Sequence, residues 1–212
     1  MNNLAKQIEN LNNELSQQIP LEVLEVFEKS ISDLKTQNIE NKSIKIGDVI
    51  SPFSLLNAQN QLVHSKDILK KGKTILAFYR GSWCPYCNLE LRALQNNITK
   101  IASHNVSLLA VSPQSPDHSN ALSEKHQLTF DVFTDENNQL AKQLGIDFKL
   151  QDFALPTYQA IGINLNEFNQ DNENTLPVPA VFVIDSDGSV IYKFVDSDYR
   201  NRLDIEELIQ SL

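Results

Sequence analysis

The two cysteines of this 212-residue chain, Cys84 and Cys87, lie three positions apart in a Cys-Pro-Tyr-Cys motif. The motif follows a short apolar, β-rich run over residues 74–79 and precedes a segment whose leucines repeat with the period of a helix. Cys84 is therefore expected at the start of a helix, and Cys87 about one turn further on. Unpaired N–H groups and the positive end of the helix dipole favour a thiolate there. These features indicate a reactive, exchangeable thiol pair.

The residues around the two cysteines fit this interpretation. Pro85 falls at the first helical position, where a proline loses no hydrogen bond. Arg80 precedes Cys84 by four residues and adds positive charge near the thiols. Trp83 and Tyr86 flank the cysteines, and they are candidates for an apolar rim that receives a substrate or a protein partner. Ordinary packing of these two rings is the competing interpretation.

Two other interpretations of the cysteines compete with a redox pair. A structural zinc site needs four ligands, and a single Cys-X-X-Cys supplies two. The four histidines are scattered and show no paired ligand spacing; they are His64, His104, His118 and His126. Two unrelated buried cysteines are the other alternative, but a strand followed by Cys-X-X-Cys and a helix is the context of a redox motif. We therefore expect redox chemistry without a metal or a bound cofactor.

Composition narrows the choice of partners and compartment. The net charge of −9 and the lack of a basic cluster argue against nucleic acid as a partner. No apolar run approaches the roughly 20 residues of a membrane span, so no membrane partner is expected. The first residues lack the basic and apolar regions of a secretory signal. Two cysteines at catalytic spacing, without a disulfide framework, fit a reducing compartment, so we expect a cytoplasmic protein.

Residues 1–42 are expected to form a helical arm ahead of the main domain. Apolar residues recur in the first half at spacings of four, three and four, and Pro20 begins a second helix with a similar stripe. The two stripes consist of Leu4, Ile8, Leu11 and Leu15, and of Leu24, Phe27, Ile31 and Leu34. We expect the arm to pack on its own domain. The alternative is a homodimer through a short coiled coil, for which two heptads are a weak basis.

Residues 43–212 are expected to form one α/β domain in which strands and helices alternate. Strands are expected near residues 46–55, 62–64, 74–79, 106–111, 130–135, 180–185 and 190–195. Helices are expected over 65–69, after Pro85, in a separate segment that ends near residue 126, over 138–144 and over 203–212. This order predicts a parallel sheet with right-handed crossovers, closed by a terminal hairpin. Residues 146–177 are the least regular part. They are a candidate lid or substrate loop, but a surface excursion is the preferred interpretation.

Several blocks of this domain carry a resemblance to a known family. They are GDVISPFSL, FYRGSWCPYCNLEL, the run that begins AVSPQSPDHSN, and LPVPAVFVIDSDGSVIYKFVDSDYRNR. Over roughly residues 44–212 the chain resembles the peroxiredoxin-like (AhpC/TSA) family of the thioredoxin-fold superfamily. The resemblance implies a thioredoxin-like α/β fold, in which a central mixed sheet is flanked by helices, here with an N-terminal helical extension.

The resemblance also implies an activity. Peroxiredoxins reduce hydroperoxides with a thiolate that becomes a sulfenic acid, a second thiol condenses with it to a disulfide, and thioredoxin or a similar dithiol restores the pair. We expect Cys84 to be the nucleophile, because the first cysteine of such a motif is the better exposed, and Cys87 to resolve the sulfenic acid. Cys87 is the rival nucleophile, because it aligns with the family cysteine.

The chain departs from the family pattern around the thiols. With Cys87 aligned to the family cysteine, Arg80 replaces the usual proline and Cys84 replaces the threonine that orients the peroxide. Pro179 stands where members carry an arginine, which is also the position of the cis-proline of thioredoxins. Phe78 replaces the buried acid of thioredoxins. Arg80, the helix start and main-chain amides are the remaining groups that can stabilise O–O cleavage.

Three functions follow from these observations. The leading hypothesis is a thiol peroxidase that uses a Cys84–Cys87 disulfide. The alternative is a thioredoxin-like disulfide oxidoreductase with little peroxidase activity, in which a cis Pro179 would receive the substrate backbone. The third is a non-enzymatic redox sensor that works through the helical arm.

Overall fold

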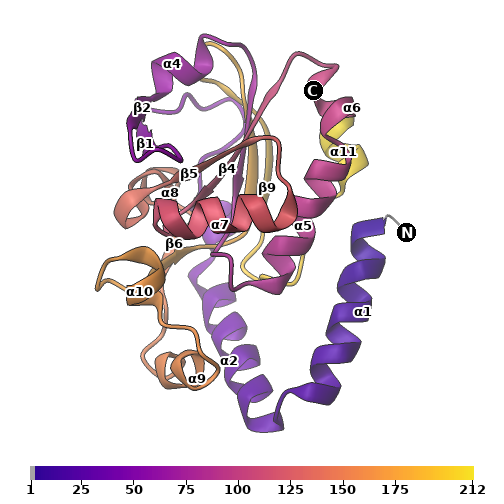
Figure 1. Cartoon of the computed structure of the whole chain (residues 1–212), viewed down its shortest axis with the longest axis vertical. Helices are drawn as coiled ribbons and strands as arrows, with labels where there is room; N and C mark the ends of the chain where they lie inside the picture. Colours follow the sequence, from indigo (N-terminus) through magenta and orange to yellow (C-terminus); the bar gives the residue numbers. More distant parts are fainter. Residues whose placement is uncertain (1–2) are drawn as a thin grey trace.

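The computed structural model describes residues 3–212, and a mixed sheet lies at its centre (Figure 1). The strands of this sheet are β1 (Ser54–Leu56), β2 (Leu62–His64), β3 (Thr74–Phe78), β4 (Ser107–Ser112), β5 (Asp131–Thr134), β8 (Ala180–Ile184) and β9 (Val190–Val195). Their spatial order is β2-β1-β5-β4-β3-β8-β9. Parallel pairs join β3, β4 and β5, whereas β8 runs antiparallel to β3 and forms a hairpin with β9. The predicted parallel part and terminal hairpin are therefore confirmed.

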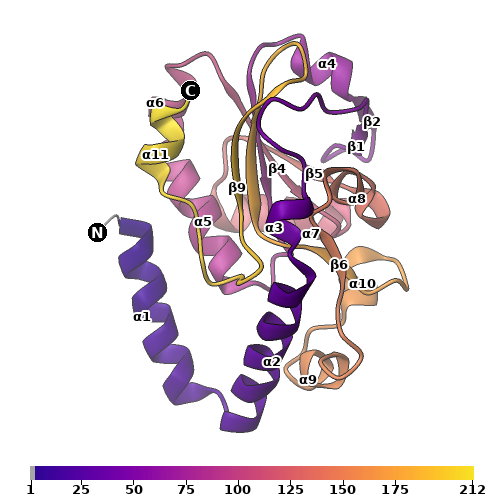
Figure 2. The same ribbon diagram turned by 180° about the vertical axis from the view of Figure 1, so that it is seen from behind.

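Helices cover both faces of the sheet (Figures 1 and 2). They are α1 (Asn3–Gln18), α2 (Leu21–Gln37), α3 (Ile39–Lys42), α4 (Ser65–Leu69), α5 (Pro85–Asn96), α6 (Ile98–Ala102), α7 (Pro116–His126), α8 (Gln139–Leu144), α9 (Leu155–Ala160), α10 (Leu165–Asn169) and α11 (Ile205–Gln210), with a 3₁₀ turn at Glu136–Asn138. Within residues 3–212, none of these helices combines the length and the apolar character needed to cross a bilayer.

The hydrophobic core lies in two layers, one on each face of the sheet. Successive side chains of a strand point to opposite faces, so Leu76 and Phe78 of β3 enter one layer while Ile75 and Ala77 enter the other. The first layer contains side chains of α2, α4 and α8, and the second contains side chains of α1, α5, α6, α7 and α11. The central strand β3 is buried on both faces, as the continuous apolar run predicts.

The N-terminal helices form a V that straddles the domain (Figure 2). The α1 stripe packs against the layer that contains α5, with Leu4 buried and Ile8, Leu11 and Leu15 partly buried. The second helix, α2, enters the opposite layer through Leu34. The prediction that the arm packs on its own domain is therefore confirmed, because its apolar stripes are covered by the sheet and its helices.

The segment between α8 and β8 is not the surface loop that the sequence analysis preferred. It contains an antiparallel pair, β6 (Asp147–Lys149) and β7 (Thr175–Pro177), and the helices α9 and α10. Ala154, Tyr158 and Leu165 are buried in the core layer that also contains α2. That expectation was wrong, because sparse apolar residues in a polar segment are enough to anchor it. The segment is therefore a folded part of the domain that packs against the core.

The buried arm residues should contribute to stability as core residues do. We expect Leu34→Ala to lower the free energy of unfolding by about 2–5 kcal/mol, because Leu34 is 3% exposed and truncation leaves a cavity. Leu21→Ala is the matched control, since Leu21 is 66% exposed in the same helix and its truncation should change stability by about 0.5 kcal/mol or less. Denaturant unfolding of both variants measures the difference; equal values would mean that the arm does not belong to the folded unit.

Candidate active site

The two thiols lie at the start of α5, as predicted. Cys84 is the N-cap residue, and its Sγ accepts a hydrogen bond from the Cys87 amide at 3.4 Å. Pro85 occupies the first turn. The two Sγ atoms are 2.7 Å apart, and the side chains are almost fully buried. The pair is therefore positioned to share one proton and to close into a disulfide with little movement.

The second cysteine is surrounded by cationic and polar donors. The Arg80 amide lies 3.5 Å from the Sγ of Cys87, and Nη2 of Arg202 lies 3.4 Å from the same atom. Arg202 is itself buried and ion-paired with Glu90, with 2.7 Å between Nη1 and Oε2. Its Nε and Nη2 also donate to the carbonyl oxygen of Tyr199. The guanidinium is thus fixed in orientation and faces Cys87.

This arrangement separates the acidities of the two thiols. Burial raises the pKa of Cys84 well above its ordinary value, and the neighbouring Cys87 adds to the rise. Burial alone would also raise the pKa of Cys87, but the Cys84 thiol, Arg202 and Arg80 together hold it well below its ordinary value. The anion of the reduced pair therefore resides mainly on Cys87, with Cys84 donating the shared proton.

Arg80 anchors an aromatic cluster beside the thiols. Its guanidinium donates to the Tyr158 hydroxyl and lies over the rings of Trp83 and Tyr199, 4.9 and 4.5 Å from their centroids. Trp83 packs edge-on against Tyr158, with 5.8 Å between the ring centroids. The Nε of Arg80 and the Nε1 of Trp83 are buried, and neither finds an acceptor among residues 3–212. Two buried N–H groups near the thiols thus lack an acceptor in the described chain.

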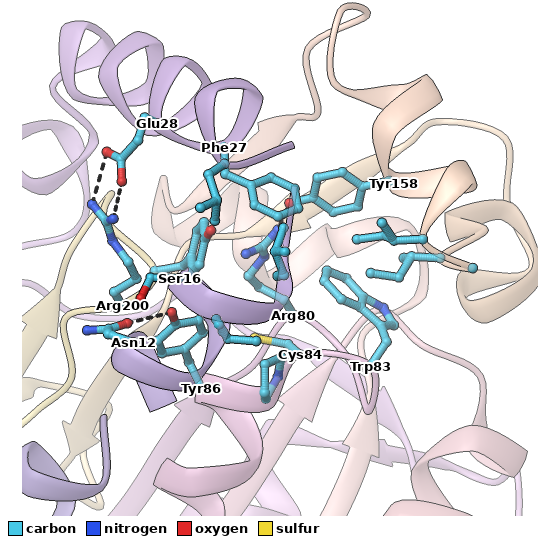
Figure 3. Close-up of a pocket in the computed structure, with 18 of the residues that line it drawn as sticks. Asn12, Ser16, Phe27, Glu28, Arg80, Trp83, Cys84, Tyr86, Tyr158 and Arg200 are labelled. Atoms are coloured by element: carbon cyan, nitrogen blue, oxygen red, sulfur yellow. Dashed lines mark hydrogen bonds and ion pairs between the residues drawn. The ribbon is translucent and has the colours of Figure 1, made fainter. Parts of the chain in front are cut away.

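A pocket of about 740 Å³ opens beside Cys84 (Figure 3). Helices α1 and α2 form one wall, and α9 with the residues after it forms another. The lining includes Asn12, Leu15, Ser16, Phe27, Arg80, Trp83, Cys84, Tyr86, Tyr158, Ile161, Tyr199 and Arg200. Cys87 is not part of this lining. A molecule in the pocket therefore meets Cys84 first.

Two polar links tie the arm across this pocket. The Tyr86 hydroxyl donates to Oδ1 of Asn12 at 2.6 Å, and Arg200 forms an ion pair with Glu28 (Figure 3). Both links join α1 or α2 to segments that surround the thiols. The arm is therefore part of the pocket, a role that its sequence did not predict.

The structure brings most of the predicted site residues together. Cys84, Cys87, Arg80 and Trp83 form one cluster. Pro179 is not among the residues that line the pocket, and the peptide bonds of residues 3–212 are all trans, so the expected cis isomer is not observed, while its support of the substrate stays a prediction. Pro179 lies at a bend, and Ala180 begins β8 directly after it.

Four residues of the site escaped the sequence analysis. Arg202, Tyr158 and Tyr199 come from segments far from the motif in the chain, and nothing local distinguishes them. Glu90 was detectable in principle, because it lies one turn after Cys87 on the core-facing side of α5. A charged residue at such a position requires a buried partner.

Comparison with known proteins places this geometry in a family. The profile of the AhpC/TSA family matches residues 46–193. Peroxiredoxin Bcp of Escherichia coli (strain K12) is 26% identical over 163 residues, which cover 76% of this chain and 92% of that protein. Chloroplastic peroxiredoxin Q of Sedum lineare is 23% identical over 190 residues, which cover 88% of each chain.

Solved structures show the same fold. Peroxidoxin BcpB from Mycobacterium tuberculosis superposes with a TM-score of 0.62 at 17% identity, covering 79% of this chain and 96% of that one. A mutant of PrxQ from Xylella fastidiosa gives a TM-score of 0.61 at 14% identity, covering 79% and 94%. A mixed sheet flanked by helices, a thiol pair at the start of α5 and a family match over residues 46–193 together establish that this chain belongs to the AhpC/TSA family of thioredoxin-fold, peroxiredoxin-like proteins.

Proposed function

We propose that this protein is a thiol peroxidase that reduces hydroperoxides with Cys84 and Cys87, and that thioredoxin or a similar dithiol reduces the resulting disulfide. Family membership supports a peroxidase of the oxidoreductase class, since the curated relatives carry the name peroxiredoxin. The observation that carries the proposal is the burial of both sulfurs beside a pocket of about 740 Å³. Such a pocket admits a small molecule but not a folded protein.

Peroxide reduction begins at Cys84. The shared proton moves to Cys87, which leaves a Cys84 thiolate at the start of α5, where the Cys87 amide and the charge of Arg80 stabilise it. The sulfur attacks one peroxide oxygen, the O–O bond breaks, and the other oxygen leaves as the alcohol, or as water, with the proton from Cys87. Cys84 becomes a sulfenic acid. Arg80 Nε and Trp83 Nε1 are the free donors for the departing oxygen.

Resolution follows within the same pair. Cys87 is again a thiolate after it has released the proton, and its sulfur lies 2.7 Å from that of Cys84 in the reduced protein. It attacks the Cys84 sulfur, the S–O bond breaks, and the hydroxide leaves with a proton from solvent as water. The product is the Cys84–Cys87 disulfide. A thiol pair within one helical turn needs no unfolding of the helix for this step.

A disulfide oxidoreductase remains the competing function. The Cys-Pro-Tyr-Cys motif at a helix start and the adjacent sulfurs suit thiol–disulfide exchange equally well. The peptide bond before Pro179 is trans, whereas this function was expected to use a cis Pro179.

Rapid mixing separates these two functions. Trp83 is the single tryptophan of the chain and adjoins Cys84, so oxidation of the pair should change its fluorescence. We expect the reduced protein to react with hydrogen peroxide or an alkyl hydroperoxide far faster than a free thiolate does. A rate constant no greater than that of a free thiolate would instead assign the protein to disulfide exchange.

Cysteine variants test the roles within the pair. In Cys87→Ser we expect one equivalent of sulfenic acid on Cys84 and no turnover, because the resolving thiol is missing. In Cys84→Ser we expect no rapid reaction with peroxide, because the sulfur that contacts the pocket is missing. Trapping with a sulfenic-acid reagent and mass spectrometry identifies the oxidised residue. Sulfenic acid on Cys87 at an undiminished rate in Cys84→Ser would reverse the two roles.

The arm should limit reduction by a protein more than reduction by a small molecule. We expect Leu11→Ala, which loosens the packing of α1 on the α5 face, to speed turnover with thioredoxin and to leave turnover with dithiothreitol unchanged, because a folded reductant reaches Cys84 only when the arm moves aside. Leu21→Ala is the control, since Leu21 is exposed. An equal response to both reductants would contradict this role of the arm.

A further inference from the structure

We propose that the pocket beside Cys84 binds an organic carboxylate with an apolar body, that Arg80 receives its charge, and that the disulfide form of the protein binds it more tightly than the reduced form. The binding site goes beyond peroxide reduction and does not depend on it, because it concerns only the two redox states of the thiol pair. The observation behind it is the environment of Arg80, which lines the pocket although it is 3% exposed.

The charge of Arg80 has no acidic partner in the described chain. Its guanidinium donates to the Tyr158 hydroxyl and forms no ion pair with a carboxylate of residues 3–212. Burial raises the pKa of Tyr158 and that of Tyr199, so both phenols stay neutral at pH 7. The rings of Trp83 and Tyr199 lie against the guanidinium and attract it, but an aromatic ring cancels no charge.

The thiol pair supplies negative charge to Arg80 only while it is reduced. Cys84 and Cys87 then share one thiolate, and both act on the charge of Arg80. A disulfide does not ionise, so oxidation of the pair removes this anion. Arg202 keeps Glu90 as a partner in either state. Arg80 becomes a buried cation without an anion, which is costly in a site shielded from water.

The walls of the pocket suit an apolar body. Its volume of about 740 Å³ is that of a site for a small organic molecule, and hydrogen peroxide would leave most of it empty. One wall comes from α1 and α2, which precede residues 46–193, the part that the family profile matches. The apolar side chains of the lining are Leu15, Ile19, Leu24, Phe27, Ile161 and Ile163.

The other charges of the lining cancel one another. Arg200 forms ion pairs with Glu28 and Asp198, and Figure 3 shows the Arg200–Glu28 pair apart from Arg80. Arg80 is therefore the cation that the lining, within the described chain, leaves for a ligand. One positive charge suits a monoanion better than a doubly charged phosphate. The planar guanidinium matches the two oxygens of a carboxylate, which is why we assign that group to the ligand.

Binding and oxidation are then coupled. A ligand that binds the disulfide form more tightly than the reduced form stabilises the disulfide by the same factor. A difference of about tenfold in affinity corresponds to a midpoint potential that is about 30 mV more negative for this two-electron couple. An organic acid in the pocket would therefore hold the pair oxidised, so its concentration would regulate the redox state of the site.

Calorimetric titration with decanoate and decanamide tests the site. The two probes have the same length, and only the first carries a charge at pH 7. Each is added, below the concentration at which it aggregates, to the full chain in reduced form and after oxidation with diamide, with the free thiols counted. We expect decanoate to bind the oxidised protein about tenfold more tightly than the reduced protein. Decanamide should bind both forms weakly and alike.

Two results of this titration would overturn the proposal. Equal affinities for decanoate and decanamide in both forms would make the pocket an apolar cavity without an anion site. Equal affinities of decanoate for the two forms, or thiols that diamide cannot join, would remove the coupling to oxidation.

Variants of Arg80 test its role. We expect Arg80→Met to lower the affinity for decanoate to that for decanamide in both redox states, because the charge is gone. Arg80→Lys, which also serves if the methionine variant does not fold, should still prefer decanoate, but more weakly, since it loses the planar fork. Lys100→Met removes an exposed ion pair with Glu206 and is the control. A redox-dependent affinity that survives in Arg80→Met, or no preference for decanoate in Arg80→Lys, would overturn the proposal.

Ile161→Gln tests the place of the apolar body. Ile161 lines the pocket and is 43% exposed, so its replacement should not disturb the core. We expect it to weaken decanoate and decanamide by a similar factor, because the wall changes while Arg80 stays. Unchanged affinities for both probes would place the bound molecule outside this pocket and overturn the proposal.

A redox titration without peroxide completes the test. In thiol–disulfide buffers, saturating decanoate should make the midpoint potential of the pair about 30 mV more negative if the affinities differ tenfold, and decanamide should leave it unchanged. No shift with decanoate would overturn the coupling. Slow reaction with peroxides would count against the proposed peroxidase alone, because neither the calorimetry nor the redox titration uses a peroxide.

Discussion

The site depends on keeping one negative charge among two sulfurs that are shielded from water. Desolvation opposes the thiolate at Cys84 and Cys87 alike, so the charge persists only where cationic and hydrogen-bond donors outweigh burial. Each sulfur receives one amide hydrogen, Cys84 from Cys87 at the start of α5 and Cys87 from Arg80 after β3, so these bonds favour the two thiolates to a similar degree. The hydrogen bond between the two thiols and the guanidinium of Arg202, which contacts the Cys87 sulfur only, together lower the pKa of Cys87. These contacts favour the anion on Cys87.

The same demand for burial explains the arm and the segment between α8 and β8. A thiolate at an open helix start would be hydrated, whereas here α1, α2 and α9 enclose the approach to Cys84. Their contacts also belong to the core, with Leu34 and Tyr158 in the same layer. The elements that shape the pocket therefore cannot be removed without loss of packing. The same helices of the arm therefore line the pocket and pack in the core.

The parts that sequence could predict are those fixed by local physics. Apolar periodicity places the strands and helices, and the position of Pro85 with the spacing of the cysteines places both thiols at the start of α5. The same reasoning finds the arm stripes and the terminal hairpin. What it misses depends on tertiary contacts: Arg202 lies 115 positions from Cys87, and Tyr158 sits in a segment whose composition resembles a surface loop. Its prediction of a cis Pro179 rests on analogy and was wrong, because no local feature requires that isomer.

The two buried arginines contact different parts of the site, Arg80 the pocket and Arg202 the sulfur of Cys87. Arg80 faces the pocket, where Tyr158, Trp83 and Tyr199 hold its guanidinium against aromatic rings and leave Nε without an acceptor in the described chain. Arg202 is not part of the pocket lining, and it contacts the sulfur of Cys87, which is also absent from that lining. One cation is thus available to an entering oxygen and the other to a thiolate behind it. A single arginine between the sulfurs would stabilise both anions equally and would not order the two steps. Under the proposed function, separate positions would allow Cys84 to meet the substrate while Cys87 retains the charge needed to close the disulfide.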